Sequence, residues 1–309
     1  MSSIMTNTSA LTALQSLNST NKNLEMTQAR ISTGFRVATA SDNSAYWSIA
    51  TTMRSDNKAN SVVQDALGLG AGKVDTAYIA MESSIGVVDQ IKQKILLAKT
   101  ASTADRAKIQ SEIAAYQSQL IDNIGGANYA GSNLLKTGST ATDPTNLTVI
   151  SSYNRDAAGA VTTGTINVAL TNIRLINTVA ATKDGLLDKE TATTGAGAVT
   201  VSVLTLNVST ATLDAVDFDG LLGNVEAALK GMATGAAELG AAKSRIDMQK
   251  DFVSKLMDSI DRGVGQLVDA DMNKESTRLQ ALQVQQQLGI QALSIANSNS
   301  QSILSLFRG

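Results

Sequence analysis

The chain has 309 residues, a formal net charge of −2, a single proline, 3% aromatic residues, and neither cysteine nor histidine. The nearly balanced charge disfavours nucleic-acid binding, which needs a basic surface. The lack of cysteine and histidine excludes disulfides, thiol nucleophiles, the usual zinc sites and the commonest general base, so we expect no enzyme activity, no metal and no cofactor.

One proline in so long a chain permits very long helices, and few aromatic residues favour narrow aliphatic seams. No stretch is long and apolar enough to span a bilayer, so we expect no membrane insertion. The first residues lack the basic start and unbroken apolar run of a secretory leader.

The N-terminal segment is predicted to be a helix, because its large aliphatic residues recur at helical steps. Gly34 is expected to end this helix, and Ser41 or Asp42 to cap the next one. The aliphatic residues of this stripe are Ile4, Leu11, Leu14, Leu17, Leu24 and Ile31.

A second helix is predicted from about Ser44 towards Lys99, and a shorter third helix around residues 109–124. The second contains GLGAGK, residues 68–73. Its spacing differs from that of a phosphate-binding loop and Val74 stands where a magnesium-binding hydroxyl is needed, so small residues at a tight helix contact explain these glycines better.

The middle of the chain, from residue 136 to about 220, loses helical periodicity and becomes rich in Thr, Ser, Gly and Val. Segments such as TINVALTNIRLI and AVTVSVLTLNV alternate apolar and polar residues, which is typical of strands. Helical spacing returns after residue 220 and continues to the C-terminal end. We therefore predict a mainly α protein, in which N- and C-terminal arms form a long antiparallel bundle or coiled coil around a central β-containing inserted domain.

The C-terminal helix keeps an apolar stripe almost to its last residue, although chain ends usually fray. Its flanks carry neutral Gln and Asn where ordinary coiled coils carry charges. A dimeric coiled coil is one interpretation, and a wall built from many copies, in which isolated ends order only on assembly, is the other. The stripe consists of Leu279, Leu282, Leu288, Leu293, Ile295, Ile303, Leu306 and Phe307. On the second interpretation, the residues of this stripe and of the N-terminal stripe are the predicted polymer interface.

Both ends resemble the bacterial flagellins. Residues 7–56 are similar to the family's N-terminal signature, and SRIDMQKDFV, LVDADMNKES and residues 279–307 are similar to its C-terminal signature. The matching motif residues are Arg30, Gly34, Asp42, Asn43, Arg245, Asp269, Asp271 and Glu275.

The resemblance implies a structural subunit that polymerises into the flagellar filament, the helical propeller for swimming. It implies a homo-polymer, which other flagellins could join, and as further partners the flagellar export apparatus, an export chaperone, the filament cap and the hook-junction proteins. It also implies secretion to the extracellular filament without leader cleavage. The implied domains are an inner-tube domain (1–40 and 268–309), a helical rod (41–135 and 221–267) and a variable outward-facing insert (136–220).

Two alternatives remain at this stage, a hook–filament junction protein and a secreted adhesin whose insert binds a surface ligand. The chain also departs from the family pattern at Tyr46 and Trp47, because a glycine and an aliphatic residue usually follow the acidic pair in that family. We interpret Trp47 as a core-packing residue, with a contact between subunits as the alternative.

Overall fold

The computed structural model describes residues 7–140, 143–179 and 182–306, and it divides into two compact units. Unit 1 comprises Met1–Asn57 and Asp258–Gly309, and unit 2 comprises Lys58–Met257. Within the described residues, no helix has both the length and the hydropathy needed to cross a membrane.

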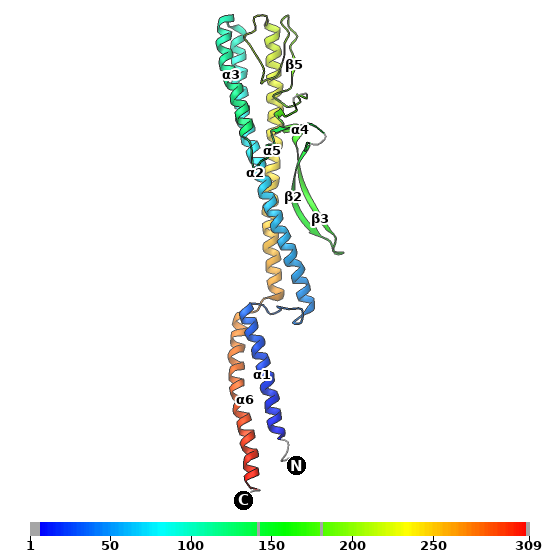
Figure 1. The fold of residues 1–309 in the computed structure, drawn as a ribbon, viewed down its shortest axis with the longest axis vertical. Coiled ribbons are helices and arrows are strands. Elements are labelled where there is room, and N and C mark those ends of the chain that lie inside the picture. Colours follow the sequence, from blue (N-terminus) through cyan, green and yellow to red (C-terminus); the bar gives the residue numbers. More distant parts are fainter. Residues whose placement is uncertain (1–6, 141–142, 180–181, 307–309) are drawn as a thin grey trace. The chain divides into compact units, whose positions relative to one another are not determined.

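Unit 1 is built on α1 (Thr8–Thr33) and α6 (Met272–Leu306), which lie side by side as an antiparallel pair (Figure 1). It also contains the first turns of α2 (Ser44–Thr100) and the last turns of α5 (Ala215–Val268). Asn7 caps α1 by accepting a hydrogen bond from the Ala10 amide, and Gly34 ends it with φ of 75°, a left-handed conformation that glycine adopts without strain.

Unit 2 packs α2, α3 (Thr103–Gly126) and α5 around one aliphatic core. Buried residues on α2, and on α5 from Phe218 to Leu239, repeat at alternating steps of three and four, which keeps one face of each helix against its neighbours. Ser84 takes a position in the α2 seam and is fully buried, whereas the larger Ile85 beside it is only partly buried. The seam of α2 is Val63, Leu67, Gly70, Val74, Ala77, Met81, Ser84, Val88, Ile91, Ile95 and Ala98.

The segment between α3 and α5 forms short strands and one long hairpin. The hairpin pairs β2 (Asn146–Arg155) with β3 (Val161–Ala169) in antiparallel register, with an irregularity between Ile150 and Ser152. A one-turn helix, α4 (Leu170–Ile173), follows. Two further pairs are parallel β1 (Lys136–Thr137) with β4 (Ile176–Asn177), and antiparallel β5 (Thr191–Ala192) with β6 (Thr200–Val201).

This segment shares the core of the helices. Val149, Ile166, Leu175 and Leu206 belong to the same cluster of buried side chains as α2, α3 and α5. The fold class predicted from the sequence, a mainly α protein with a central β-containing segment, is confirmed.

The strand expected across AVTVSVLTLNV is mostly wrong, because only Thr200 and Val201 pair as a strand. Beyond them the backbone bonds to side-chain amides of α3. Gln117 donates to the Val203 and Leu206 carbonyls at 3.0 Å each, and Gln110 accepts from the Val208 amide at 2.8 Å. The alternating pattern arises because Val203, Leu206 and Val208 are buried against the helices.

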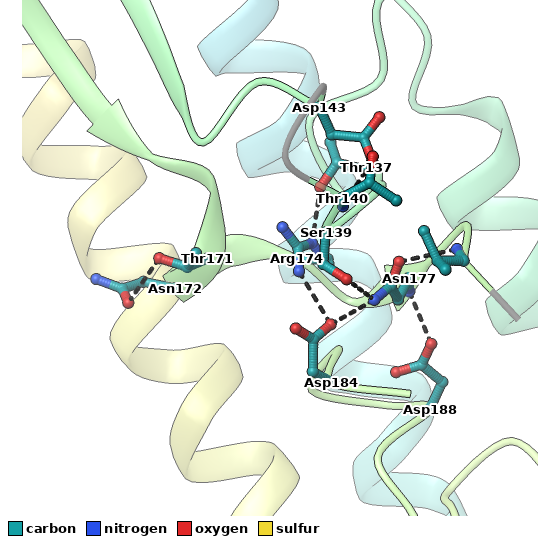
Figure 2. A network of polar contacts seen from close by, with 11 residues as sticks. Thr137, Ser139, Thr140, Asp143, Thr171, Asn172, Arg174, Asn177, Asp184 and Asp188 are labelled. Atoms are coloured by element: carbon teal, nitrogen blue, oxygen red, sulfur yellow. Dashed lines mark hydrogen bonds and ion pairs between the residues drawn. The ribbon is translucent and has the colours of Figure 1, made fainter. Parts of the chain in front are cut away.

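A buried arginine fixes the loops around β1 and β4 (Figure 2). Arg174 is 3% exposed, and its guanidinium donates to Thr137 Oγ1 and Asp184 Oδ1 at 2.9 Å each. Asn177 also donates to Asp184, at 2.6 Å. Because a buried charge is tolerated only when it is paired and hydrogen-bonded, these contacts hold the loops in one arrangement.

A second buried charge fixes the start of α5. Asp217 is fully buried, and its carboxylate accepts bonds from Thr193 Oγ1 at 2.7 Å and from the Gly195 and Gly197 amides at 3.0 Å. The hydrogen bond from the Thr193 hydroxyl has the largest effect, and with the bonds from backbone amides it holds the pKa of Asp217 below its ordinary value. The carboxylate therefore ties the β5–β6 loop to the first turn of the helix.

The tight contact expected at GLGAGK exists, but it is with a strand and a loop instead of a helix. A Cβ built on Gly70 would lie 2.6 Å from Val149 Cγ1 on β2, and one on Gly72 would lie 2.5 Å from the Tyr129 ring. A Cβ built on Gly68, two residues earlier on the same helix, would meet no neighbouring atom within 4 Å.

These neighbouring glycines give a matched test. Gly70→Ala is expected to destabilise the protein by about 1–3 kcal/mol, because buried, β-branched Val149 has little freedom to move away. Gly68→Ala is expected to stabilise it by up to about 1 kcal/mol through helix propensity. Urea unfolding followed by circular dichroism measures both, and equal effects of the two substitutions would contradict the contact.

Candidate functional site

The contact between α1 and α6 divides the predicted apolar residues into two sets. Along each helix the half-buried and buried positions follow a heptad pattern, which defines one seam. The α1 side consists of Ala10, Ala13, Leu17, Thr20, Leu24, Thr27 and Ile31, and the α6 side of Glu275, Leu279, Leu282, Gln286, Gly289, Leu293 and Ala296.

Four of the predicted interface residues lie outside this seam. Leu11 is 58% exposed, Leu14 44%, Leu288 57% and Ile295 63%. Other large apolar side chains on the same two helices are also exposed. They are Met26, Met272, Val284 and Ile290.

The remaining predicted interface residues either lie in the seam or fall outside what the structure describes. Leu17, Leu24, Ile31, Leu279, Leu282 and Leu293 face the partner helix of the same chain. Ile4 and Phe307 lie outside the described residues, and the side chains of Ile303 and Leu306 are not described.

Polar contacts set the register of the pair, and sequence periodicity alone did not reveal them. Asn7 Nδ2 donates to the Ala296 carbonyl at 2.9 Å, and Gln286 Nε2 donates to Asn21 Oδ1 at 2.8 Å. A Cβ on Gly289 would lie 3.1 Å from Leu17 Cδ1, so the helices approach closely there. Small and neutral polar residues therefore occupy seam positions that would be Leu or Ile in a strong coiled coil.

Two motif residues from opposite ends of the chain meet in this pair. Arg30 Nη1 lies 3.4 Å from Glu275 Oε1. Glu275 is 7% exposed, and its Oε2 is buried with no partner among the described residues. The family resemblance identified both Arg30 and Glu275 as motif residues, and the structure shows that they pair with each other.

Five further motif residues shape the turns of unit 1. Gly34 accepts a hydrogen bond from the Ala270 amide at 2.9 Å, and Phe35 forms an isolated antiparallel bridge with Asp269. Asp271 Oδ1 accepts from the amides of residues 273 and 274, which caps α6. The strand-like pairing of residues 34–37 with residues 268–270 therefore joins the two terminal arms.

Asp42 and Asn43 organise the turn before α2. Asp42 Oδ2 accepts bonds from the Thr39 amide at 2.9 Å, the Thr39 hydroxyl at 3.1 Å and the Ala38 amide at 3.1 Å. Asn43 Oδ1 accepts from the Tyr46 amide at 3.1 Å. The N-cap expected at Ser41 or Asp42 is thus wrong, because Asn43 provides it and Asp42 closes the preceding loop.

Arg245 is separate from the other motif residues. It is exposed on α5 in unit 2, where it lines a cavity of about 340 Å³ with Glu238 and β3 residues 166–169.

The core-packing interpretation of Trp47 is also wrong. Trp47 is 38% exposed and neighbouring Tyr46 is 42% exposed. The small core of unit 1 consists of Val37, Ala50, Val264 and Val268 and includes neither aromatic residue. Helical spacing alone did not distinguish an exposed aromatic residue at this position from a core residue.

Within the described ranges, no group of three or more His, Cys, Asp or Glu residues is arranged to hold a metal ion. The carboxylates that do gather have other partners: Asp184 binds Arg174, and Asp217 binds backbone amides. Unit 1 therefore combines exposed apolar side chains with helices that carry no charge towards their free ends. The first charged residue of the chain is Lys22, and no residue from 279 to 307 carries a charge.

Comparisons with known proteins cover both ends of the chain. Residues 4–140 match the bacterial flagellin N-terminal helical region, and residues 222–307 match the bacterial flagellin C-terminal helical region. The chain is 55% identical to a flagellin of Brucella melitensis and 48% identical to flagellin C of Rhizobium meliloti, each over the full length of both proteins. A crystal structure of Bacillus cereus flagellin aligns with 62% of the chain and 88% of its own, at 16% identity and a TM-score of 0.39, too low to inform the fold.

The turn around Asp42 predicts a pH dependence. Hydrogen bonds from the Thr39 amide and hydroxyl, and a weaker one from the Ala38 amide, hold the pKa of Asp42 below its ordinary value of 3.8. A lowered pKa means that the turn gains stability above pH 3.8 and loses it as the pH falls through the pKa of the folded state.

We expect the Asp42 carboxyl carbon, followed by NMR, to titrate with a midpoint below 3.8, and the Thr39 amide to shift with the same midpoint. Asp42→Asn should abolish the shared transition, whereas Asp258→Asn, at an exposed position on α5, should leave it intact. A midpoint at or above 3.8 would contradict the hydrogen bonding.

Proposed function

Since this chain belongs to the bacterial flagellin family, we propose that the exposed apolar residues of α1 and α6 are the contacts through which it polymerises. The chain is a structural subunit of the flagellar filament and not an enzyme. No observation favours the hook–filament junction protein or the adhesin.

The observation that carries the proposal is the narrow seam between α1 and α6. It covers one face of each helix and leaves Leu11, Leu14, Leu288 and Ile295 in water. An exposed apolar surface of this kind usually marks an interaction site. Covering one large aliphatic side chain contributes about 1.5–3 kcal/mol, and a filament repeats that contribution for every subunit added.

The lack of charge towards the free ends of these helices supports contact with identical copies. Like charges would repel when copies stack side by side, whereas neutral Gln and Asn both donate and accept hydrogen bonds. The residues that stay exposed on α6 include Gln280, Gln283, Gln287 and Gln291. They suit contacts between helices crowded on several sides.

We further propose the domain division expected from the sequence, with residues 1–40 and 268–309 in the filament interior, residues 41–135 and 221–267 as the rod, and residues 136–220 facing outward. The interior position is supported by the uncharged side chains of residues 2–21 and 279–307, and the outward one by the exposed tip of the β2–β3 hairpin. The apolar pattern of the two stripes continues in four residues near the chain ends, which we propose as further contacts between subunits. They are Ile4, Ile303, Leu306 and Phe307.

The remaining partners are proposed from the family. They are the export apparatus, an export chaperone, the filament cap and the hook-junction proteins, with secretion to the extracellular filament. Rhizobium meliloti has several flagellins similar to this chain, which supports a filament of mixed subunits.

Substitutions at two leucines of α6 distinguish polymerisation from the pairing of α1 with α6 within one chain. Leu288→Ser is expected to raise the critical concentration for polymerisation about tenfold to a hundredfold and to leave the helicity of the monomer unchanged, because Leu288 is outside the seam. Leu282→Ser should also loosen the α1–α6 pair itself, since Leu282 is 7% exposed.

Sedimentation measures the critical concentration, and circular dichroism the helicity. Thr277→Ser, at an exposed position near the start of the same helix, is the control and should change neither quantity. Normal growth of filaments from Leu288→Ser would refute the role of this face.

Hydrogen exchange tests whether the ends order on assembly. The thin seam predicts weak protection of α1 and α6 amides in dilute monomer, and an increase of about a hundredfold or more in the filament. The α2 and α5 amides in unit 2, which already have a continuous core, should change much less. Equal protection of α1 in both states would contradict coupled folding and assembly.

A further inference from the structure

Arg245 is a motif residue whose side chain has no partner in the described part of the chain. It is exposed on α5, and no described residue forms a hydrogen bond or an ion pair with it. It lines the cavity of about 340 Å³ between α5 and β3, here called the β3–α5 groove, and both elements belong to unit 2. An unpaired guanidinium beside a groove is suited to binding a carboxylate.

The β3 wall of this groove is the edge of a strand. Four consecutive residues of β3, Ile166, Asn167, Val168 and Ala169, line the cavity. Because consecutive side chains point to opposite faces of a strand, a surface that touches all four runs along the strand edge, where the backbone groups lie. Within the described ranges β3 pairs only with β2, so alternate N–H and C=O groups on its other edge are unpaired.

The groove is held in shape from both sides. Asn172 lies beside α5 (Figure 2), where its Nδ2 donates to Glu238 Oε1 at 2.9 Å. A Cβ built on Gly235 would lie 3.0 Å from the Asn172 carbonyl oxygen, so the chain that follows β3 packs closely on α5. Ile166 and Val168 are buried in the core of unit 2. A ligand therefore meets a preformed groove, which lowers the ordering entropy lost on binding.

The charges on α5 restrict the ligand. Glu238 is the first α5 residue along the groove and Arg245 the last, and the rise of an α-helix places them about 10 Å apart. Between them lie Ala241 and Ala242, which form a small apolar floor. About three to four residues of extended chain cover this distance. The matching ligand is a short extended peptide with a carboxylate near Arg245 and a cation near Glu238.

We propose that the β3–α5 groove binds an extended peptide segment of another protein, which adds a strand to the free edge of β3 and places an acidic side chain on Arg245. Backbone hydrogen bonds to β3 supply affinity, and the charges of Arg245 and Glu238 set the direction of the bound segment. The proposal does not depend on polymerisation, because the site is complete in one chain.

A synthetic peptide tests the groove directly. The probe is an end-capped, fluorescein-labelled Lys-Val-Thr-Val-Asp peptide, whose two charged side chains lie on one face of a strand. Anisotropy measures its binding to dilute full-length monomer, and saturable binding is expected. Arg245→Gln in the protein, or Asp→Asn in the peptide, should weaken binding about tenfold, and both changes together no further, because each removes the same charge-assisted pair.

The backbone contribution is measured separately. A peptide with N-methyl groups on alternate backbone nitrogens should bind about tenfold more weakly or worse, because it cannot donate to β3. Alternate amides among residues 166–169 should gain protection from hydrogen exchange when the unmodified peptide binds. Lys250→Gln, at an exposed position of α5 outside the groove, is the control and should change the affinity by less than about twofold. Circular dichroism checks that each variant is folded.

Each contrary outcome is specific. The absence of saturable binding to wild-type monomer would overturn the proposal, and so would equal binding of the N-methylated peptide, which would indicate an apolar ligand site without strand addition. An equal loss of affinity in Lys250→Gln would reduce the effect to general charge attraction and overturn it as well. If the monomer bound no peptide and Arg245→Gln raised the critical concentration for polymerisation, the edge of β3 would belong to a contact between subunits.

Discussion

A pair of helices buries only one face of each, and this geometric limit governs the behaviour of unit 1. The seam between α1 and α6 uses one heptad face, where several positions are Ala, Thr, Gln or Gly. Leu11, Leu14, Leu288 and Ile295 cannot enter it without displacing the residues already there. Unit 2 differs because α2, α3 and α5 share a continuous core with the hairpin and loops between them, although Leu96, Met248 and Phe252 are exposed there as well. The α1–α6 pair thus depends on a single seam, whereas unit 2 has a core with several contributing elements.

The charged groups of unit 1 are concentrated where the chain turns. Arg30 pairs with Glu275, Asp42 closes the loop before α2, and Asp271 caps α6. Beyond these turns both helices run towards their free ends with almost no charge. Charge is therefore used to set local geometry, and its absence leaves the helical surfaces compatible with close packing of identical copies.

Sequence periodicity identified the helices and most of the seams, because a heptad pattern specifies which residues lie on one face. It could not separate Leu14 from Leu17, since both satisfy helical spacing and only the position of α6 decides which is covered. Ser84 and Ile85 pose the same problem on α2, where the smaller residue takes the buried position. The strand expected around Leu206 failed for another reason: Gln110 and Gln117 satisfy backbone groups that a strand would have paired. Polar contacts of this kind, like that of Asn21 with Gln286, depend on tertiary register and leave no periodic trace.

The β2–β3 hairpin of unit 2 is suited to the insertion of foreign sequence at its tip. Its base is anchored by Val149, Ile166 and Val168, whereas residues 154–163 are exposed. Foreign peptide grafted at the turn around Gly159 would leave those anchors untouched, so the hairpin is the natural place to display added sequence. If the tip faces outward as proposed, each engineered filament would carry one graft per subunit, a dense and regular array of epitopes built by self-assembly.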